Sequence, residues 1–400
     1  MNKQPYIVLR AVLPDGPTPP LGTRTRDGSR SRGPEIRLRV ETEELRSGEP
    51  QRLRQQRDVL GVAPPLPLRL VAPTEKTTAA VKDDGPVSWG VRAVGADKCT
   101  WTAEKIVVAV LDTGIDRGHE AFVGVDIDDH EFTGTGAGDA NGHGTHCAAT
   151  IFGQGDKGLR CGVAPSIGKA LVAKVLDSEG AGTTNSLTQG IIWALQKGAN
   201  IITMSLGMDF PGYVRSLVEF GLPVELATSK ALEAYRENIR FFDKLADLVT
   251  IAGPFGPGAL LIAAAGNESN RDGSPSLEIG VAPPAVASGV VSVAALQQVK
   301  IGSELMKVAP FSNTGAQVAA PGVSIFSAQA GGGYVEMSGT SMATPHVAGV
   351  AALWAAKMLS EEDRLDPRAL ADRVIGTTRR FAGWQSIDVG AGLVQAPVSS

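Results

Sequence analysis

From residue 86 onward, short apolar runs rich in β-branched residues recur along the chain, each bounded by turn residues. They cover residues 106–111, 170–176, 200–206, 259–265 and 290–294, and helical patterns lie between several of them, as at 184–197. Continuous apolar strands that alternate with helices predict a mostly parallel sheet, because both faces of such strands are buried. We therefore expect an α/β fold of three layers, αβα, with functional groups at the carboxyl ends of the strands.

The composition fits one large domain with an appendage. The chain has 400 residues, 43% of them hydrophobic, and its net charge of -4 gives no general attraction to nucleic acid or anionic membranes. No apolar stretch reaches the roughly 18 residues of a membrane span, and no signal peptide is evident. Cys99, Cys147 and Cys161 form no CxxC pair and no disulfide framework. We expect a cytoplasmic protein, with secretion as the alternative and the oligomeric state undetermined.

Residues 1–85 differ from the rest of the chain because they are rich in arginine and proline. Residues 6–10 and 36–40 alternate like short strands, residues 50–60 fit a charged helix, and residues 66–71 fit a third strand. The stretch at 22–34 has the composition of a disordered loop. Two interpretations stay open, a small α+β appendage and a partly disordered basic tail.

A second departure from the strand–helix rhythm is the segment 208–258, which separates two predicted strands. Within it, apolar residues follow one another at intervals of three and four, as on an amphipathic helix. These are Leu232, Tyr235, Ile239, Phe242 and Leu245. We interpret the segment as a helical insertion.

Three polar stretches invite a joint interpretation. Asp112 follows the apolar run at 106–111, His143 lies in Asn-Gly-His-Gly-Thr-His-Cys, and Ser341 opens an apolar helical pattern. A serine hydroxyl is a weak nucleophile near neutral pH, so it needs an imidazole base, and the imidazole needs a buried carboxylate. The order Asp, His, Ser is one of those found in such triads. Taken singly, the aspartate could cap a turn and the histidine could be satisfied within its helix.

The stretch HGTHC, with two histidines three apart and a thiol, raises a metal site as an alternative. Zinc proteases usually carry HExxH and a third ligand, whereas no glutamate separates His143 from His146. Asp126, Asp128 and Asp129 could bind calcium, although a solvated loop is the simpler interpretation.

Taken together, the three stretches resemble the motifs of the subtilisin-like serine proteases (subtilases, peptidase family S8). The matching segments are VAVLDTGID around Asp112, NGHGTHCAATI around His143 and SGTSMATPHVAGVAAL around Ser341. Further matches are GVAP (162–165), ITMSLG (202–207), LLIAAAGN (260–267), FSNTGAQVAAPG (311–322) and SWGVRAVGADK (88–98). The resemblance spans about residues 86–395, and the wording GHGTHC is closest to the proteinase K-like branch.

The resemblance implies a subtilisin-like serine endopeptidase that forms an acyl-enzyme, with Asp112, His143 and Ser341 as its triad. Asn267 matches the asparagine of the oxyanion hole. The expected substrate-binding residues are Ser205, Leu206, Gly207, Ala264, Ala265 and Gly266. Ser205-Leu206-Gly207 would pair with an extended peptide, and both segments would form walls of the first specificity pocket. Protein or peptide substrates are therefore the expected partners.

No cofactor is required by this chemistry, and no metal site is assigned. Many subtilases bind calcium through a carboxylate shortly after Asp-Thr-Gly, but Ala121 stands at that place, so only calcium at some other site stays open. His146 and Cys147 are expected to be packing neighbours of the base.

The resemblance also assigns parts to the two unusual segments. Residues 1–85 stand where the family has its propeptides, so we expect an inhibitory module of a zymogen, followed by a peptidase domain at 86–395. The insertion at 208–258 follows a pocket wall directly, and we expect a lid or flank of the cleft. The alternative for the whole chain is a protease-fold binding or scaffold protein whose cleft is occluded.

Overall fold

The computed structural model describes residues 3–12, 37–46, 48–77, 86–155, 158–251 and 258–398, and the predicted loop at 22–34 lies outside them. Its main sheet has the order β14-β13-β12-β10-β6-β8-β7, with β15 also paired to β13. The strands are β6 (Val107–Asp112), β7 (Ile127–Glu131), β8 (Lys169–Lys174), β10 (Ile201–Met204), β12 (Leu260–Ala264), β13 (Val290–Gln298), β14 (Met306–Val308) and β15 (Val318–Pro321). Every pairing is parallel except that of β14 with β13.

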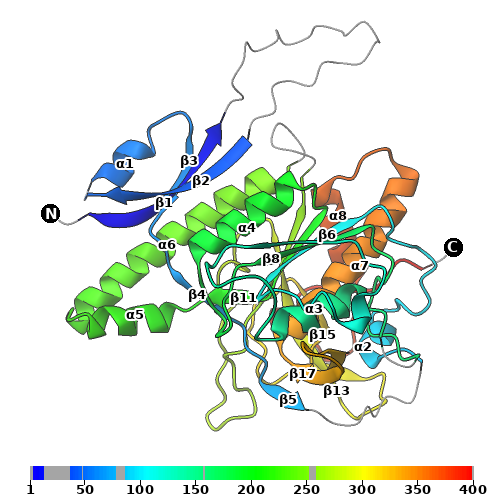
Figure 1. Ribbon diagram of the computed structural model, residues 1–400. Coiled ribbons are helices and arrows are strands. Elements are labelled where there is room, and N and C mark those ends of the chain that lie inside the picture. Colours follow the sequence, from blue (N-terminus) through cyan, green and yellow to red (C-terminus); the bar gives the residue numbers. More distant parts are fainter. Residues whose placement is uncertain are drawn as a thin grey trace, which may run out of the picture.

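Helices cover both faces of this sheet (Figure 1). On one side lie α3 (His143–Phe152) and α7 (Thr340–Glu361), with α8 (Pro367–Gly376) against α7, and on the other lie α4 (Thr184–Gln196) and α6 (Val224–Val249). Strand β6 feeds both cores, because Val108 and Val110 pack on the first side and Ala109 and Leu111 on the second. The predicted α/β fold with three layers is confirmed.

The shorter elements of the domain lie around these layers. They are α2 (Trp89–Ala93), the 3₁₀ helix Glu120–Phe122, β9 (Ala181–Thr183), β11 (Leu206–Met208), β16 (Ile325–Ala328), β17 (Tyr334–Ser338) and α9 (Ser386–Val389).

The N-terminal appendage is a small antiparallel sheet, β2-β1-β3, with one short helix. Its elements are β1 (Gln4–Val12), β2 (Arg37–Leu45), α1 (Glu49–Leu53) and β3 (Val59–Ala63). Along β1, Ile7 and Leu9 face the core shared with α4 and α6, whereas Val8 packs in a separate cluster with Leu53 of α1. We call residues 3–63 of the described chain the N-terminal module. The helix is shorter than the pattern at 50–60 indicated, because the chain turns at 54–58 to enter β3.

The run at 66–71 forms the predicted strand, β4 (Pro67–Leu70), and this strand lies outside the sheet of the module. It pairs antiparallel with β11 and β9 of the main domain. Further along, β5 (Glu75–Thr77) pairs with β17. We call residues 66–77 the tail of the module; Figure 1 shows it continuing from the module along the main domain.

The insertion forms α5 (Phe210–Glu219) and α6, and it contacts both the module and the tail. A Cβ on Gly61 of β3 would lie 2.9 Å from the ring of Phe241. Arg54 of the module pairs with Glu237 at 3.0 Å. Asp209, the N-cap residue of α5, pairs with Arg69 of the tail at 2.7 Å. The helical insertion therefore flanks the appendage.

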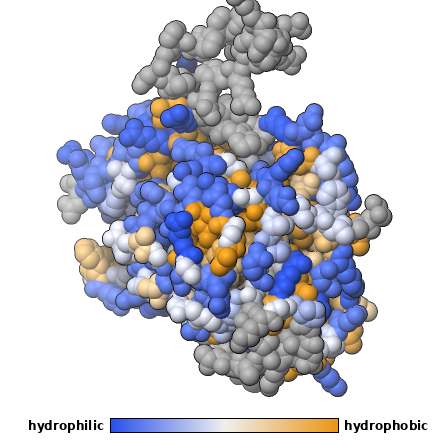
Figure 2. Space-filling view, turned by 45° about the vertical axis from the view of Figure 1, so that its right-hand side comes forward, coloured by the Kyte–Doolittle hydropathy of each residue, from blue (hydrophilic) through white to orange (hydrophobic). Residues whose placement is uncertain are grey.

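The surface mixes polar and apolar side chains, as in Figure 2, where one face is mostly hydrophilic with an apolar area near its centre. Among the described residues, no helix is both long and apolar enough to cross a membrane.

Candidate active site

Three different elements bring Asp112, His143 and Ser341 into one region. Asp112 is the last residue of β6, His143 the first of α3, and Ser341 the second of α7. All three are at most 1% exposed. As the parallel sheet predicts, the site lies beyond the carboxyl end of a central strand, where the helices begin.

Asp112 and His143 form a buried hydrogen-bonded pair. The Nδ1–H of His143 donates to Asp112 Oδ1 at 2.8 Å, and the backbone N–H of Thr113 donates to the same oxygen at 2.7 Å. Burial alone would lower the pKa of His143, but the adjacent Asp112 carboxylate and Cys147 raise it, and the net direction is well above the ordinary 6.5. The pair therefore fixes the tautomer that leaves Nε2 free to accept a proton.

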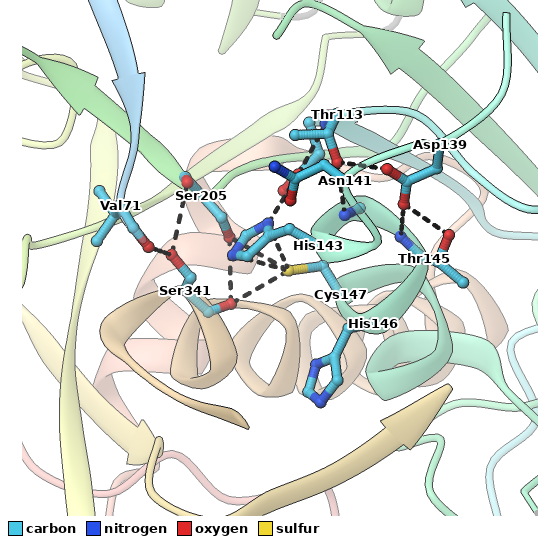
Figure 3. Close-up of polar contacts among 12 residues, drawn as sticks. Val71, Thr113, Asp139, Asn141, His143, Thr145, His146, Cys147, Ser205 and Ser341 are labelled. Atoms are coloured by element: carbon cyan, nitrogen blue, oxygen red, sulfur yellow. Dashed lines mark hydrogen bonds and ion pairs between the residues drawn. The ribbon is translucent and has the colours of Figure 1, made fainter. Parts of the chain in front are cut away.

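Ser341 is occupied by the tail. Its Oγ donates to the carbonyl oxygen of Val71 at 2.6 Å (Figure 3). Within the described residues, its hydroxyl makes no hydrogen bond to His143. The side chain lies at the N-terminus of α7, where backbone N–H groups and the helix dipole favour a negative charge.

The tail runs along the predicted wall Ser205-Leu206-Gly207 as an antiparallel strand. The N–H of Val71 donates to the carbonyl of Ser205 at 3.2 Å. Leu70 pairs with Leu206, and Arg69 pairs with Gly207. A bound peptide strand would make the same kind of contacts, so the tail occupies this wall in the manner of a substrate.

Asn267 contacts the residue of the tail that follows Val71. Its Nδ2 donates to the carbonyl oxygen of Ala72 at 2.8 Å. Its Oδ1 accepts from the N–H and the hydroxyl of Thr340, at 2.8 and 2.9 Å. Because both Thr340 donors engage the oxygen, the amide is oriented with its NH₂ toward the cleft.

Ala264 is the last residue of β12, and Ala265 and Gly266 connect it to Asn267. Gly266 N–H donates to the Thr340 hydroxyl at 3.2 Å, and a Cβ at this glycine would lie 2.2 Å from Asn313 Nδ2. In the described part of the chain, the hydrogen bonds of these three residues lead to the framework and not to the tail.

Sequence reasoning missed Asn313, which holds the loop after Asn267. Its Nδ2 donates to the carbonyl of Ala265 at 3.1 Å and to Glu268 Oε2 at 2.6 Å, and its Oδ1 accepts from the N–H groups of Glu268 and Ser269. Its place in FSNTGAQVAAPG was a signal, because a buried asparagine in a loop usually bonds backbone groups. The contacts of Val71 and Ala72 with the site were also missed. The sequence held a signal for them, since an apolar run there ends at Pro73.

His146 and Cys147 differ sharply from His143. His146 points away from the other labelled side chains (Figure 3), and its Nε2–H donates to the carbonyl of Ile325 at 2.9 Å. Burial lowers the pKa of His146 to about 3, so it stays neutral. Cys147 Sγ lies 3.7 and 3.9 Å from the two ring nitrogens of His143, and burial raises the pKa of its thiol.

Asp112, His143 and Cys147 offer ligand atoms within 4.8 Å of one another, so a metal deserves a test of fit. The donor set does not fit well. Burial keeps the Cys147 thiol protonated, whereas a metal ligand must be a thiolate. Its sulfur is about equally distant from both ring nitrogens of His143, so it lies beside the ring rather than along a nitrogen lone pair. The His143 Nδ1–H already bonds Asp112.

Two of the three carboxylates considered for calcium, Asp128 and Asp129, are engaged in ion pairs. Asp128 pairs with Lys197 at 2.9 Å and Lys169 at 3.5 Å, and Asp129 pairs with Arg117 at 2.7 Å. Ala121 is buried and has no ligand atom on its side chain.

Comparison with known proteins points the same way. The subtilase family matches residues 103–392 of the chain. Subtilisin DY from Bacillus licheniformis is 30% identical over 322 residues, which cover 78% of this chain and 98% of that protein. A thermostable alkaline protease from Halalkalibacterium halodurans is 38% identical over 255 residues, 62% of this chain and 55% of that protein. An intracellular serine protease from Paenibacillus polymyxa is 34% identical over 277 residues, 67% of this chain and 73% of that protein.

Proposed function

The chain belongs to the subtilase family and is a subtilisin-like serine endopeptidase, and from this premise we propose that Asp112, His143 and Ser341 are its catalytic triad. His143 Nε2 takes the proton of Ser341 Oγ as the oxygen attacks the scissile carbonyl, and Asp112 stabilises the imidazolium that forms. His143 then gives the proton to the leaving amine, and water hydrolyses the acyl-enzyme by the same route. The 2.8 Å bond between His143 Nδ1 and Asp112 supports these roles.

Asn267 supplies one donor of the proposed oxyanion hole, and the N–H of Ser341 supplies the other. The single observation that carries the whole proposal is the position of the tail, which brings the carbonyls of Val71 and Ala72 to Ser341 Oγ and Asn267 Nδ2 at 2.6 and 2.8 Å. A nucleophile and an amide donor thus contact neighbouring carbonyls of one extended strand. Acyl transfer needs these two groups together at the backbone of a bound peptide, with both directed at the same carbonyl once a substrate replaces the tail.

The substrate-binding residues follow from the same strand. We propose that Ser205, Leu206 and Gly207 pair with the acyl side of a peptide, and that Ala264, Ala265 and Gly266 complete the pocket. Val71 and Leu68 of the tail are 6% and 1% exposed, whereas Arg69 points outward with most of its side chain in solvent. The preferred substrates are therefore peptides with apolar residues at the positions of Val71 and Leu68.

Residues 1–85 are proposed to keep the peptidase domain, 86–395, inactive as a zymogen. The tail fills the cleft as a continuous chain on both sides of Ser341, since β4 pairs with β11 before it and β5 pairs with β17 after it. The carbonyl held by Asn267 belongs to Ala72, and the amide that follows is that of Pro73. Ser341 Oγ is meanwhile bonded to an oxygen, that of Val71, and not aimed at a carbonyl carbon.

Labelling with a fluorophosphonate probe tests the triad. We expect Ser341 to be labelled in the wild type once the tail is displaced or cut, and labelling to be lost in Ser341→Ala. Absence of labelling and of peptide hydrolysis in every wild-type preparation would favour the alternative, a scaffold protein with an occluded cleft. Mass spectrometry of both proteins tests the zymogen: if an active wild type keeps the same intact mass as Ser341→Ala, autoprocessing is wrong.

The remaining assignments rest on chemistry and on one relative. We propose that catalysis needs no cofactor, because the chain supplies nucleophile, base and oxyanion donors, and that EDTA leaves activity unchanged. Neither nucleic acid nor membrane is a proposed partner, in keeping with the net charge of -4.

Free cysteines and the intracellular serine protease of Paenibacillus polymyxa support a cytoplasmic location. Cys147 after His146 supports a place near the proteinase K-like branch, although the relatives named above carry other names.

A further inference from the structure

Asp139 connects Thr113, the residue after Asp112, to the helix that begins with His143 (Figure 3). Its Oδ1 accepts from the Thr113 hydroxyl and from the Gly142 N–H, both at 2.8 Å. Its Oδ2 accepts from the N–H and the hydroxyl of Thr145, at 2.8 and 2.6 Å. We propose that Asp139 is a positioning residue, acting through Thr113, that sets the geometry of the Asp112–His143 pair. This inference rests on the proposed triad.

Thr113 is the link through which Asp139 reaches the catalytic carboxylate. Its N–H donates to Asp112 Oδ1 at 2.7 Å, while its hydroxyl donates to Asp139 and accepts from the Gly144 N–H at 3.0 Å. The side chain of Thr113 therefore bonds both Asp139 and Gly144, the residue after His143. A shift of Thr113 would move both members of the Asp–His hydrogen bond relative to each other.

Asp139 also replaces the missing cap of α3. The N-cap residue is Gly142, which has a φ of 91° and no side chain to accept from the first turn. The carboxylate of Asp139 accepts from the N–H groups of Gly142 and Thr145 instead. A negative charge is favourable at a helix N-terminus, and His143 is the first residue of that helix.

The backbone segments around this network are packed closely against one another. A Cβ on Gly114 would lie 2.2 Å from the carbonyl oxygen of Gly138, and a Cβ on Gly144 would lie 2.2 Å from that of Gly114. Lys174, which is buried, donates to the carbonyls of Thr113 and Gly138 at 2.9 and 3.2 Å. The loop after Asp112, the residue before Asp139 and the start of α3 are thus held together from two sides.

The chemistry of the site indicates which substitution is informative. All four groups that face Asp139 are donors, so the amide of Asn would direct an NH₂ toward an N–H or a hydroxyl and lose at least one bond. A displacement of a catalytic group by about 1 Å can cost about 10²-fold in rate. We expect Asp139→Asn to lower kcat about 10- to 100-fold and to change KM by less than about threefold, because the cleft walls are untouched.

The experiment uses the full chain after it has reached maximal activity on a peptide amide substrate. Thr113→Val should lower kcat as Asp139→Asn does, whereas Thr113→Ser should retain most of the activity because it keeps the hydroxyl. The double variant Asp139→Asn with Thr113→Val should have a kcat no lower than that of the less active single variant. Asp366→Asn is the matched control, since Asp366 caps α8 through the N–H groups of Arg368 and Ala369, away from the triad.

The outcomes separate this inference from the proposed function. If Asp139→Asn matches Asp366→Asn in kcat within about twofold, or if the losses of Asp139→Asn and Thr113→Val add fully, Asp139 does not act through Thr113 on the triad. If Asp139→Asn does not fold, the contrast of Thr113→Val with Thr113→Ser decides, and equal kcat in the two overturns the inference. A His143→Ala variant that keeps normal turnover would instead overturn the triad itself.

Discussion

The hydroxyl of Ser341 donates a 2.6 Å hydrogen bond to the carbonyl oxygen of Val71, a residue 270 positions earlier in the chain. Although Ser341 and Val71 are far apart in the sequence, the tail is held beside Ser341 because it pairs with β11 on one side and with β17 on the other. We therefore expect the position of the tail to control whether a substrate can reach Ser341.

A charge placed at Val71 should open the site. Val71→Asp would bury an unpaired carboxylate, which costs roughly several kcal/mol. The tail should therefore leave the cleft. We expect fluorophosphonate labelling of the uncut chain to become at least about tenfold faster. Ala72→Asp is the matched control, because the side chain at 72 is exposed and only its backbone oxygen contacts Asn267. Equal labelling rates in the wild type and Val71→Asp would contradict an occluding tail.

The two histidines of HGTHC should respond in opposite ways to substitution. His143→Ala removes the base and should lower kcat by at least about 10⁴-fold with a folded protein. His146→Gln should lower the melting temperature, because the buried bond to Ile325 is disturbed, but the folded protein should keep kcat within a few-fold. Thermal melts and active-site titration separate the two effects. A loss of kcat at His146 as deep as that at His143 would contradict the assignment of the base.

Removal of the Asn267 amide should reduce turnover while leaving substrate binding largely intact. An oxyanion donor acts mainly on the charge that develops in the transition state, so Asn267→Ala should lower kcat about 10²- to 10³-fold with little change in KM. Thr340→Val should give a smaller loss, because Thr340 orients the amide through Oδ1. Steady-state kinetics on one peptide substrate measures both. A dominant effect on KM would place Asn267 in ground-state binding instead.

The pH dependence should reflect the raised pKa of His143. The base must be neutral, so kcat/KM should rise with pH through a midpoint above 6.5. Since the folded pKa lies above the unfolded one, the protonated pair stabilises the fold fully below 6.5, and this contribution is lost as pH rises through the folded pKa. Activity should therefore increase over the same pH window in which this contribution to the free energy of unfolding falls. An acid limb at or below 6.5 would contradict the raised pKa.

Local sequence was enough to predict the layers of the fold, because the strands around Asp112 and Asn267 are continuous apolar runs that end in polar residues. The roles of the site residues came from the motifs and not from the strands. The sequence did not reveal which segments far apart in the chain contact each other. The run at 66–71 has the pattern of a strand, but pattern alone does not say which edge a strand pairs with, and so its pairing with β11 was missed.

The supporting groups were missed for a related reason. Asp139, Thr113 and Asn313 are polar residues in loops, and loop polarity usually indicates solvent exposure. Thr113 and Asn313 are nevertheless buried and Asp139 is half-buried. Their low exposure follows from how β6, α3 and β12 meet in space, which depends on packing between distant segments. Asn238 of α6 is a similar case, since it is fully buried and donates to the carbonyl of Pro64 at 2.8 Å.

The ion pair between Arg54 and Glu237 links the module to the insertion, and reversing its charges should loosen the module. Arg54 also donates to the carbonyl of Val62, so it fixes the end of β3 against α6. Arg54→Glu would face Glu237 with a like charge, and we expect labelling of Ser341 in the uncut chain to become about two- to fivefold faster, as about 1 kcal/mol of docking is lost.

The double variant Arg54→Glu with Glu237→Arg restores opposite charges at the same place, so its labelling rate should return toward that of the wild type. This double-mutant cycle distinguishes a specific contact from a general loss of stability, because two independent destabilising changes would add and not cancel. The rates should also converge at high salt, since both side chains reach solvent. If neither single reversal changes the labelling rate, the insertion does not hold the module over the cleft through this pair.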